Sequence, residues 1–298
     1  MPARARGAPA CMTAVALALI LAAAAIHAVW NLLAKRAGGG APFVWLFTLL
    51  SGVLYTPAVA VLLVVQRASV SATGVAFMAG SALLHVVYFV SLQRGYQTGD
   101  LSLVYPLARG TGPLLATLAA MAVLGERPTP LALVGAALIV GGVFVLTGGT
   151  RVLARAGTNP WAVRYGLLTG ATIAAYTLWD KYGVAQVGVP PLVYDWGSNL
   201  GCAALLAPVA LARWHEVRGH WAAHRVEIVG IALLAPLAYF LVLTAMVFTP
   251  VSYVAPAREI SILVATVLGT RVLAEGDAPR RLAAAGSMVA GLIALALG

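Results

Sequence analysis

The chain has 298 residues, of which 61% are hydrophobic and 9% are charged, and its nineteen basic and nine acidic residues give a net charge of +10. Soluble domains carry about 25% charged residues, so this composition excludes a soluble fold and indicates a membrane protein. The bases lie singly or in pairs between apolar runs. This spacing excludes the dense basic tracts of nucleic-acid-binding proteins and is typical of loops that orient membrane helices.

A helix that spans the hydrocarbon core needs about 20 apolar residues. The sequence predicts ten such helices, at residues 12–35, 43–66, 72–94, 101–124, 129–147, 161–184, 191–212, 226–248, 251–273 and 279–297. Turn residues mark the breaks, among them Gly148 to Pro160 and a loop from Arg213 to Arg225. The first run follows Arg4 and Arg6, so an alternative interpretation is a cleaved signal peptide. Its length favours a membrane span.

The sequence repeats at an offset of 149 residues, which is half its length. The matching pairs are Arg109 with Arg258, Glu126 with Glu275, Leu124 with Leu273, Trp30 with Trp179, Pro42 with Pro191 and Gly52 with Gly201. Such a period indicates a tandem duplication, with one five-helix repeat in residues 1–149 and another in residues 150–298. Because five is odd, the second repeat enters the membrane from the opposite side. The sequence therefore predicts two inverted repeats around a central cavity.

Short motifs recur in both copies. The first copy has His27, Trp30, Asn31 and Lys35, then Leu124-Gly125-Glu126, Gly135, Ile139 and Gly141-Gly142. The second keeps Trp179, Leu273, Glu275 and Gly291, but has Asp180 for the Asn, Ala274 for a Gly and Ala284 for Gly135. In their order and repetition these residues resemble the EamA family of the drug/metabolite transporter superfamily. The resemblance covers essentially the whole chain and implies a ten-helix permease for small organic metabolites or drugs.

Two arginines lie deep in predicted spans. Arg109 comes about eight residues into its helix, hence about 12 Å below the helix start and near the middle of the hydrocarbon core. Arg258 lies at the equivalent depth and precedes Glu259. A charge there costs about 2.5–3.5 kcal/mol or more. Either both arginines line a cavity and bind a carboxylate or phosphate of the substrate, or Glu259 neutralises an arginine and locks helices together.

Aromatic and polar residues accompany these charges at helical spacing, i, i+3 and i+4, in the first and sixth helices. Such a face suits a pocket that stacks an organic body and orients its polar end. The alternative is that Trp30 and Trp179 only mark the depth of the lipid headgroups. The predicted substrate-binding residues are His27, Trp30, Asn31, Tyr88, Tyr105, Arg109, Tyr176, Trp179, Asp180, Arg258 and Glu259.

Proton coupling is a further hypothesis, with Asp180 and Glu259 as better candidates than His27 or His85, because a buried histidine is more often a packing residue. Prolines and glycines interrupt the fourth and ninth helices, and such breaks expose backbone carbonyls or let a helix flex. The interrupting residues are Pro106, Gly110, Gly112, Pro113 and Pro256.

Other repeated residues are assigned to structure. Glu126 and Glu275 each precede a helix that starts with proline, where a carboxylate satisfies free amides. Small-residue spacing in the fifth and tenth helices predicts close packing between halves or protomers. The glycines concerned are Gly135, Gly142, Gly286 and Gly291. The isolated Cys11 and Cys202 predict no disulfide, and no spacing indicates a metal site or a cofactor.

The sequence therefore predicts a secondary transporter of a small polar or zwitterionic metabolite in a bacterial-type inner membrane, working as a monomer or homodimer. The alternatives are efflux of amphipathic cations, a membrane-embedded enzyme, and a receptor or scaffold. Twelve Lys and Arg residues lie in odd-numbered loops, against five at the termini and in even-numbered loops. By the positive-inside rule this count places both termini outside the cytoplasm.

Overall fold

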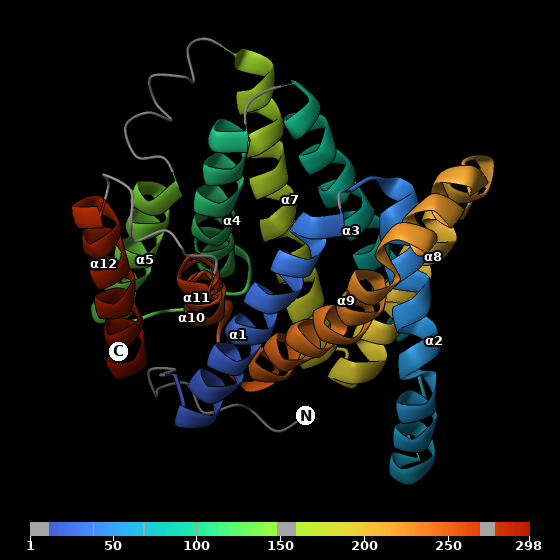
Figure 1. Cartoon of the computed structure of the whole chain (residues 1–298). Coiled ribbons are helices and arrows are strands. Elements are labelled where there is room, and N and C mark those ends of the chain that lie inside the picture. The colour runs from blue at the N-terminus through green and yellow to red at the C-terminus, as the bar shows by residue number, and fades with distance from the viewer. Residues whose placement is uncertain (1–11, 38, 68, 99–100, 148–158, 269–277) are drawn as a thin grey trace.

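The computed structural model describes residues 12–37, 39–67, 69–98, 101–147, 159–268 and 278–298, which form helices and no strands (Figure 1). The helices are α1 (Ala14–Ala37), α2 (Ala41–Gln66), α3 (Ala72–Thr98), α4 (Leu101–Val123), α5 (Pro130–Thr147), α7 (Pro160–Ala185), α8 (Pro191–Ala212), α9 (Trp214–Phe248), α10 (Val251–Ala257), α11 (Ile260–Leu268) and α12 (Ala278–Leu297). Their bounds follow the predicted apolar runs closely, with two exceptions.

The first exception is the start of α9. The predicted loop from Arg213 to Arg225 is almost entirely helical, and His224 (φ −135°, ψ 29°) marks a kink between it and the predicted span. The segment contains helix-compatible Trp, Glu, Arg and Ala residues, and only Gly219 disfavours a helix. Its polar composition predicts a loop, but exposed Trp214 and Trp221 together with polar neighbours are typical of a helix at a membrane surface.

The second exception is the predicted ninth span, which is broken into α10 and α11. Pro256 has no backbone N–H to continue the helical ladder. Beyond it, the amides of Glu259, Ser261 and Ile262 bond to carbonyls three residues back, at 3.0, 3.1 and 2.9 Å. Bonds of this span make a tighter 3₁₀-type turn. Arg258 and Glu259 are therefore placed in an irregular segment between two short helices.

Six described helices are long and apolar enough to cross a membrane: α1, α2, α3, α5, α9 and α12. Apolar side chains are highly exposed on their outer faces, for example Val61 at 63%, Val226 at 73% and Leu282 at 65%. Contiguous exposed apolar surface of this kind suits lipid. The all-helical membrane fold is thus confirmed. The described parts of the other predicted spans form α4, α7, α8, α10 and α11, which fall short of that apolarity or length.

Helices from the two halves of the chain interleave. α5 packs on α12, α4 on α7, α1 on α9, α3 on α7, and α2 on α8. An exchange of the halves turns the α1–α9 contact into the α7–α3 contact, and the α3–α8 contact into the α9–α2 contact, and both members of each pair are present. Figure 1 shows α1 rising and α7 descending in the same view. These are the relations that an inverted repeat requires; the domain boundary at residues 149 and 150 stays a prediction.

The contact between α5 and α12 has the same reciprocal character. A Cβ on Gly135 would lie 2.6 Å from the Gly291 carbonyl oxygen, and a Cβ on Gly291 would lie 2.6 Å from that of Gly135. Gly142 approaches the Ala284 carbonyl oxygen in the same way, at 2.9 Å. The predicted close packing therefore joins the two halves through three of the four glycines. Gly286 is the exception, because it faces open space.

Candidate functional site

An ion pair joins the two halves in the interior of the bundle. Arg109 in α4 places its Nε 3.1 Å from Oε2 of Glu259, and the two side chains are only 14% and 5% exposed. The same guanidinium donates from Nη2 to the Ser261 hydroxyl at 3.4 Å. Glu259 therefore forms its ion pair with Arg109, across 150 residues of sequence, and its electrostatic interaction with the neighbouring Arg258 is the lesser one. For Arg109 the locking hypothesis is supported.

Arg258 is held differently from Arg109. Its guanidinium lies over the ring of Tyr239 in α9, with Cζ 5.4 Å from the ring centroid. No carboxylate in the described ranges forms an ion pair with it. A partly buried cation held only by an aromatic face retains most of its hydrogen-bonding capacity. Arg258 is therefore the arginine that can receive an anion.

The two halves differ at this point in sequence. The residues that follow Arg258 are Glu259 and, two positions later, Ser261, whereas the equivalent positions after Arg109 are Gly110 and Gly112. The second half thus supplies both groups that hold the Arg109 side chain. The duplicated arginines are equivalent in position but not in environment.

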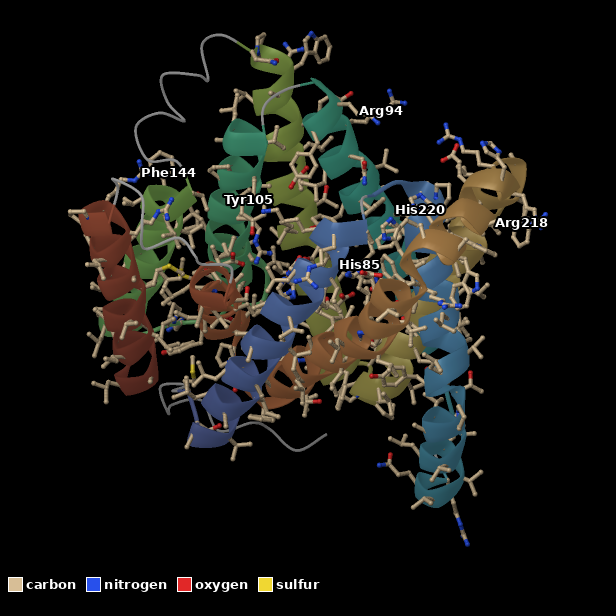
Figure 2. The ribbon with its side chains drawn as sticks, in the orientation of Figure 1. His85, Arg94, Tyr105, Phe144, Arg218 and His220 are labelled. Atoms are coloured by element: carbon tan, nitrogen blue, oxygen red, sulfur yellow. The ribbon has the colours of Figure 1, made fainter. Side chains whose placement is uncertain are left out.

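An aromatic cluster lies beside the arginines. His85 stacks on Tyr176 with centroids 4.3 Å apart, and Tyr88 meets the same ring edge-on at 5.8 Å. Tyr239 lies edge-on to His85 at 5.5 Å and to Tyr176 at 6.4 Å. In Figure 2, His85 lies within the bundle, in contrast to Arg218 at its periphery. These rings come from α3, α7 and α9, and such a set can stack against an organic solute.

Tyr105 and Tyr88 belong to the Arg109 side of this interior. Both lie within electrostatic range of the Arg109 guanidinium and of Glu259. Tyr105 precedes Arg109 by one helical turn on α4, and its side chain is labelled within the bundle in Figure 2. The structure thus brings Tyr88, Tyr105, Arg109 and Glu259 together as the sequence predicted.

Asp180 is completely buried in α7. The Tyr194 hydroxyl donates to its Oδ1 at 2.9 Å, and the Tyr239 hydroxyl donates to its Oδ2. No basic side chain of the described residues pairs with it. The neighbouring Lys181 instead donates to the carbonyl oxygens of Met246 and Thr249. Asp180 is therefore a buried acid held by two phenols, linked through Tyr239 to Arg258.

The predicted substrate-binding residues of α1 differ in whether their polar groups are already hydrogen-bonded. His27 lies within electrostatic range of both Arg109 and Arg258. Trp30 meets His27 edge-on at 4.7 Å, and its buried indole N–H lacks a hydrogen-bond partner in the described part of the chain. Asn31 donates its amide to the His27 carbonyl oxygen at 2.8 Å, within its own helix. His27 and Trp30 can therefore face a ligand, whereas this donor of Asn31 is already engaged.

The structure does not bring Trp179 to the cluster. Its side chain is 37% exposed and stacks on Phe77 of α3 at 4.5 Å. The indole N–H donates to the Phe77 carbonyl oxygen at 2.8 Å. On the helix Trp179 is about 100° from Asp180, so when Tyr176 and Asp180 point inward, Trp179 points toward the neighbouring helix and the outer surface. The predicted shared face holds for Tyr176 and Asp180 only.

Three interior residues were missed from the sequence: Tyr239, Tyr194 and Asp195. None has a similar residue at the equivalent position of the first half, where Val90, Trp45 and Leu46 stand. A search for repeated polar residues therefore passed over them. Asp195 did offer a signal, since it is an acid inside the predicted span 191–212, where ionisable residues are usually functional.

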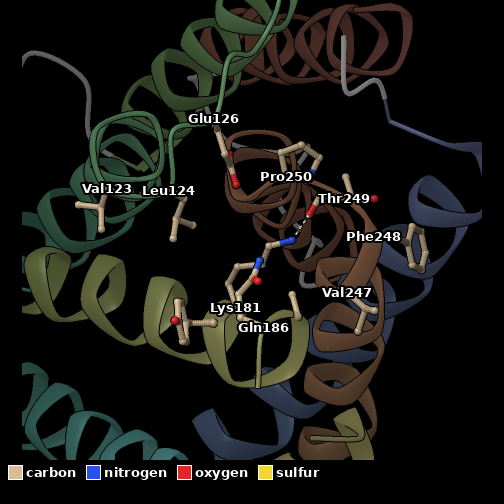
Figure 3. A pocket seen from close by; sticks show the side chains of 11 residues that line it. Val123, Leu124, Glu126, Lys181, Gln186, Val247, Phe248, Thr249 and Pro250 are labelled. Carbon is tan, nitrogen blue, oxygen red and sulfur yellow. Dashed lines mark hydrogen bonds between the residues drawn. The ribbon is translucent and has the colours of Figure 1, made fainter. Parts of the chain in front are cut away.

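A separate pocket of about 700 Å³ opens at one end of the bundle, between α4, α7, α9 and α10 (Figure 3). It contains none of the predicted substrate-binding residues. On its wall, Glu126 accepts hydrogen bonds from the amides of Val251 and Ser252 at 2.7 and 2.8 Å. The capping role of Glu126 is correct, but the capped helix is α10 in the other half and not the following α5. Glu275 lies outside the described residues.

Among the described residues, no group of three or more His, Cys, Asp or Glu side chains is arranged to hold a metal ion. Cys202 is buried in α8 and donates to the Ala82 carbonyl oxygen at 3.5 Å. The described interior thus combines cations, acids and aromatic rings.

A multi-pass helical protein with ionisable residues gathered at an interior helix break has the architecture of a membrane transporter. Residues 14–148 match the EamA-like transporter family. The first half of the chain is therefore similar in sequence to EamA-like transporters.

A protein crystal structure resembles the whole fold, with a TM-score of 0.72 over 95% of this chain and 96% of the other. Its sequence identity of 19% makes this a likeness of fold alone. Comparison with curated protein sequences gives no match.

Proposed function

We propose that this protein is a secondary transporter of a small polar or zwitterionic organic metabolite with an anionic group, carried by alternating access between inverted halves. The observation that supports it best is Arg258, a cation in the interior with no ion-pair partner in the part of the chain that the structure describes. A cation at this depth costs about 2.5–3.5 kcal/mol or more. A bound carboxylate or phosphate offsets that cost through paired hydrogen bonds.

The surroundings of Arg258 favour a solute with an organic body. The rings of His85, Tyr88, Tyr176 and Tyr239 form an aromatic wall next to the guanidinium. A pocket of stacked rings with a few convergent polar groups is the usual form of a small-molecule site. His27 and the unpartnered indole N–H of Trp30 add donors from the opposite half.

Efflux of amphipathic cations is the second candidate function. It is favoured by Asp180, a buried acid for which the described residues provide phenolic donors but no cation. Against it, Glu259 is already paired with Arg109. A zwitterion satisfies both observations. Its anionic group would bind Arg258, and its ammonium would lie near Asp180, which accepts the hydrogen bond of the Tyr239 hydroxyl.

Alternating access draws support from the reciprocal contacts of the two halves and from the α10–α11 break. A broken helix at mid-depth can reorient with less loss of backbone hydrogen bonds than a continuous one. Within the same proposal the protein lies in the inner membrane of a bacterial-type cell and works as a monomer or homodimer.

The test is counterflow in proteoliposomes against a panel of amino acids, organic acids, phosphorylated metabolites and organic cations. Arg258→Gln is expected to lower counterflow of anionic and zwitterionic solutes about 100-fold, because about 3 kcal/mol of charge-assisted binding is lost. Arg258→Lys is expected to recover only part of it, since an ammonium lacks the planar fork. The matched control is Arg213→Gln, an exposed arginine outside the cluster. Full counterflow by folded Arg258→Gln would overturn the proposal.

A further inference from the structure

Asp195 is a buried acid with one carboxylate oxygen that lacks a hydrogen-bond partner among the described residues. It lies in α8, 4% exposed, and its Oδ1 accepts a hydrogen bond from the Asn199 side chain at 3.1 Å. Its Oδ2 is buried and has no hydrogen-bond partner in the described ranges. An ionised carboxylate in this position has a large uncompensated desolvation cost. A proton on the free oxygen removes that cost.

Among the described residues, no cation lies within electrostatic range of Asp195. The titratable groups within electrostatic range of Asp195 are Tyr55 of α2, Asp180 of α7 and Cys202 of α8 itself. Asp180 in turn accepts hydrogen bonds from Tyr194 of α8 and Tyr239 of α9, and His85 of α3 lies edge-on to Tyr239. The histidine stacks on Tyr176, and its Nδ1 bonds to the Ser81 carbonyl oxygen at 2.9 Å. Asp195 and Asp180 thus lie within electrostatic range of each other.

A chain of contacts connects this acid pair to the proposed anion site. Asp180 receives the hydroxyl of Tyr194, whose neighbour in sequence is Asp195, and the hydroxyl of Tyr239. The Arg258 guanidinium in turn lies over the ring of Tyr239. These contacts offer a route by which a change of charge at the two acids can alter anion binding at Arg258. Any such coupling is reciprocal, so anion binding would alter proton binding by the same factor.

We propose that Asp195, sharing its site with Asp180, binds the proton that drives transport, an inference that rests on the proposed function. In one state an oxygen of Asp195 takes up one proton from the solution on one side and becomes a neutral carboxyl group. In the other state the O–H bond breaks and the proton leaves to the opposite side. Two buried carboxyls within electrostatic range of each other suit this role, since only one of them needs to be ionised at a time.

The experiment separates exchange from coupling in proteoliposomes. The solute found in the counterflow panel is followed in two assays: counterflow without any ion gradient, and uptake driven by an imposed pH gradient. Asp195→Asn, which mimics the protonated acid in shape, is expected to keep counterflow within about threefold and to lose pH-driven uptake at least about tenfold. Glu216→Gln is the matched control, an acid at the start of α9 that pairs with Arg213, and it is expected to keep both.

Three results would overturn the proposal: pH-driven uptake by Asp195→Asn at the wild-type level, loss of its counterflow together with the driven uptake, or uptake by the wild type that a sodium gradient drives and a pH gradient does not. If the variant does not fold, the test is whether adding the solute to vesicles with wild-type protein moves protons across the membrane. Absence of that proton movement refutes the proton site. A wild-type protein without counterflow for any solute would instead refute the proposed function.

Discussion

The ion pair between Arg109 and Glu259 allows a quantitative test of how the halves are held together. At a separation of 3.1 Å and an effective dielectric constant of about 20, Coulomb's law gives an attraction of about 5 kcal/mol. Much of this only offsets the loss of hydration of both groups. The net value of the pair is therefore small, whereas removal of one partner leaves the other charge buried alone.

Single and double substitutions separate these contributions. Glu259→Gln and Arg109→Gln are each expected to destabilise the protein by about 3–5 kcal/mol. The double variant is expected to recover most of that loss, because it leaves no unpaired charge. In a double-mutant cycle the coupling should reach about 2–4 kcal/mol.

Thermal unfolding of the purified protein in detergent, followed by tryptophan fluorescence and size exclusion, measures the effect. Each single variant should melt about 5–15 °C below the wild type, and the double variant should lie closer to it than either. The matched control is the surface pair Arg213 and Glu216, 57% and 38% exposed, whose coupling should stay below about 1 kcal/mol. Additive losses at the buried pair would refute the reasoning.

Three further predictions concern packing, capping and the acid network. Gly291→Ala is expected to lower the free energy of unfolding by about 1–3 kcal/mol, because the added Cβ would lie 2.6 Å from a carbonyl oxygen. Gly286→Ala, where the added Cβ would meet open space, should leave the free energy of unfolding unchanged. Equal melting temperatures of the two variants would contradict this prediction. Glu126→Ala should lower stability by about 1–2 kcal/mol through loss of the α10 cap, and its exposed neighbour Arg127→Ala should not. Tyr239→Phe should cost about 1.5–3 kcal/mol by removing a donor to a buried carboxylate; an unchanged melting temperature would exclude that role.

The fold was largely predictable from the sequence because apolar runs of membrane length leave few alternatives to helices. The start of α9 was missed because a polar segment was equated with a loop, although Trp214 and Trp221 favour a helix at the headgroup region. The break near Pro256 was anticipated, but the tightening of the backbone around Glu259 depends on which carbonyls its amides reach, and a one-dimensional pattern does not contain that information.

The candidate site was predictable to the extent that its residues are duplicated or unusual in lipid. Arg109, Arg258 and Tyr176 could be found in this way. The pairing of Arg109 with Glu259 could not, because residues from distant segments meet only through the packing of α4 on α10. Trp179 was misplaced because a helical spacing gives a face but not the direction in which that face points. Tyr239 and Asp195 were missed because the equivalent positions of the first half hold Val90 and Leu46. A search for residues that repeat in both halves does not find them.

The glycines that follow Arg109 and the Glu259 and Ser261 that follow Arg258 have a consequence for the history of such a protein. Two identical copies of the first half, assembled as a dimer, would bring their arginines to the centre with no acid to balance them. The present second half contributes what the first lacks. A single polypeptide that carries both halves always contains one of each kind.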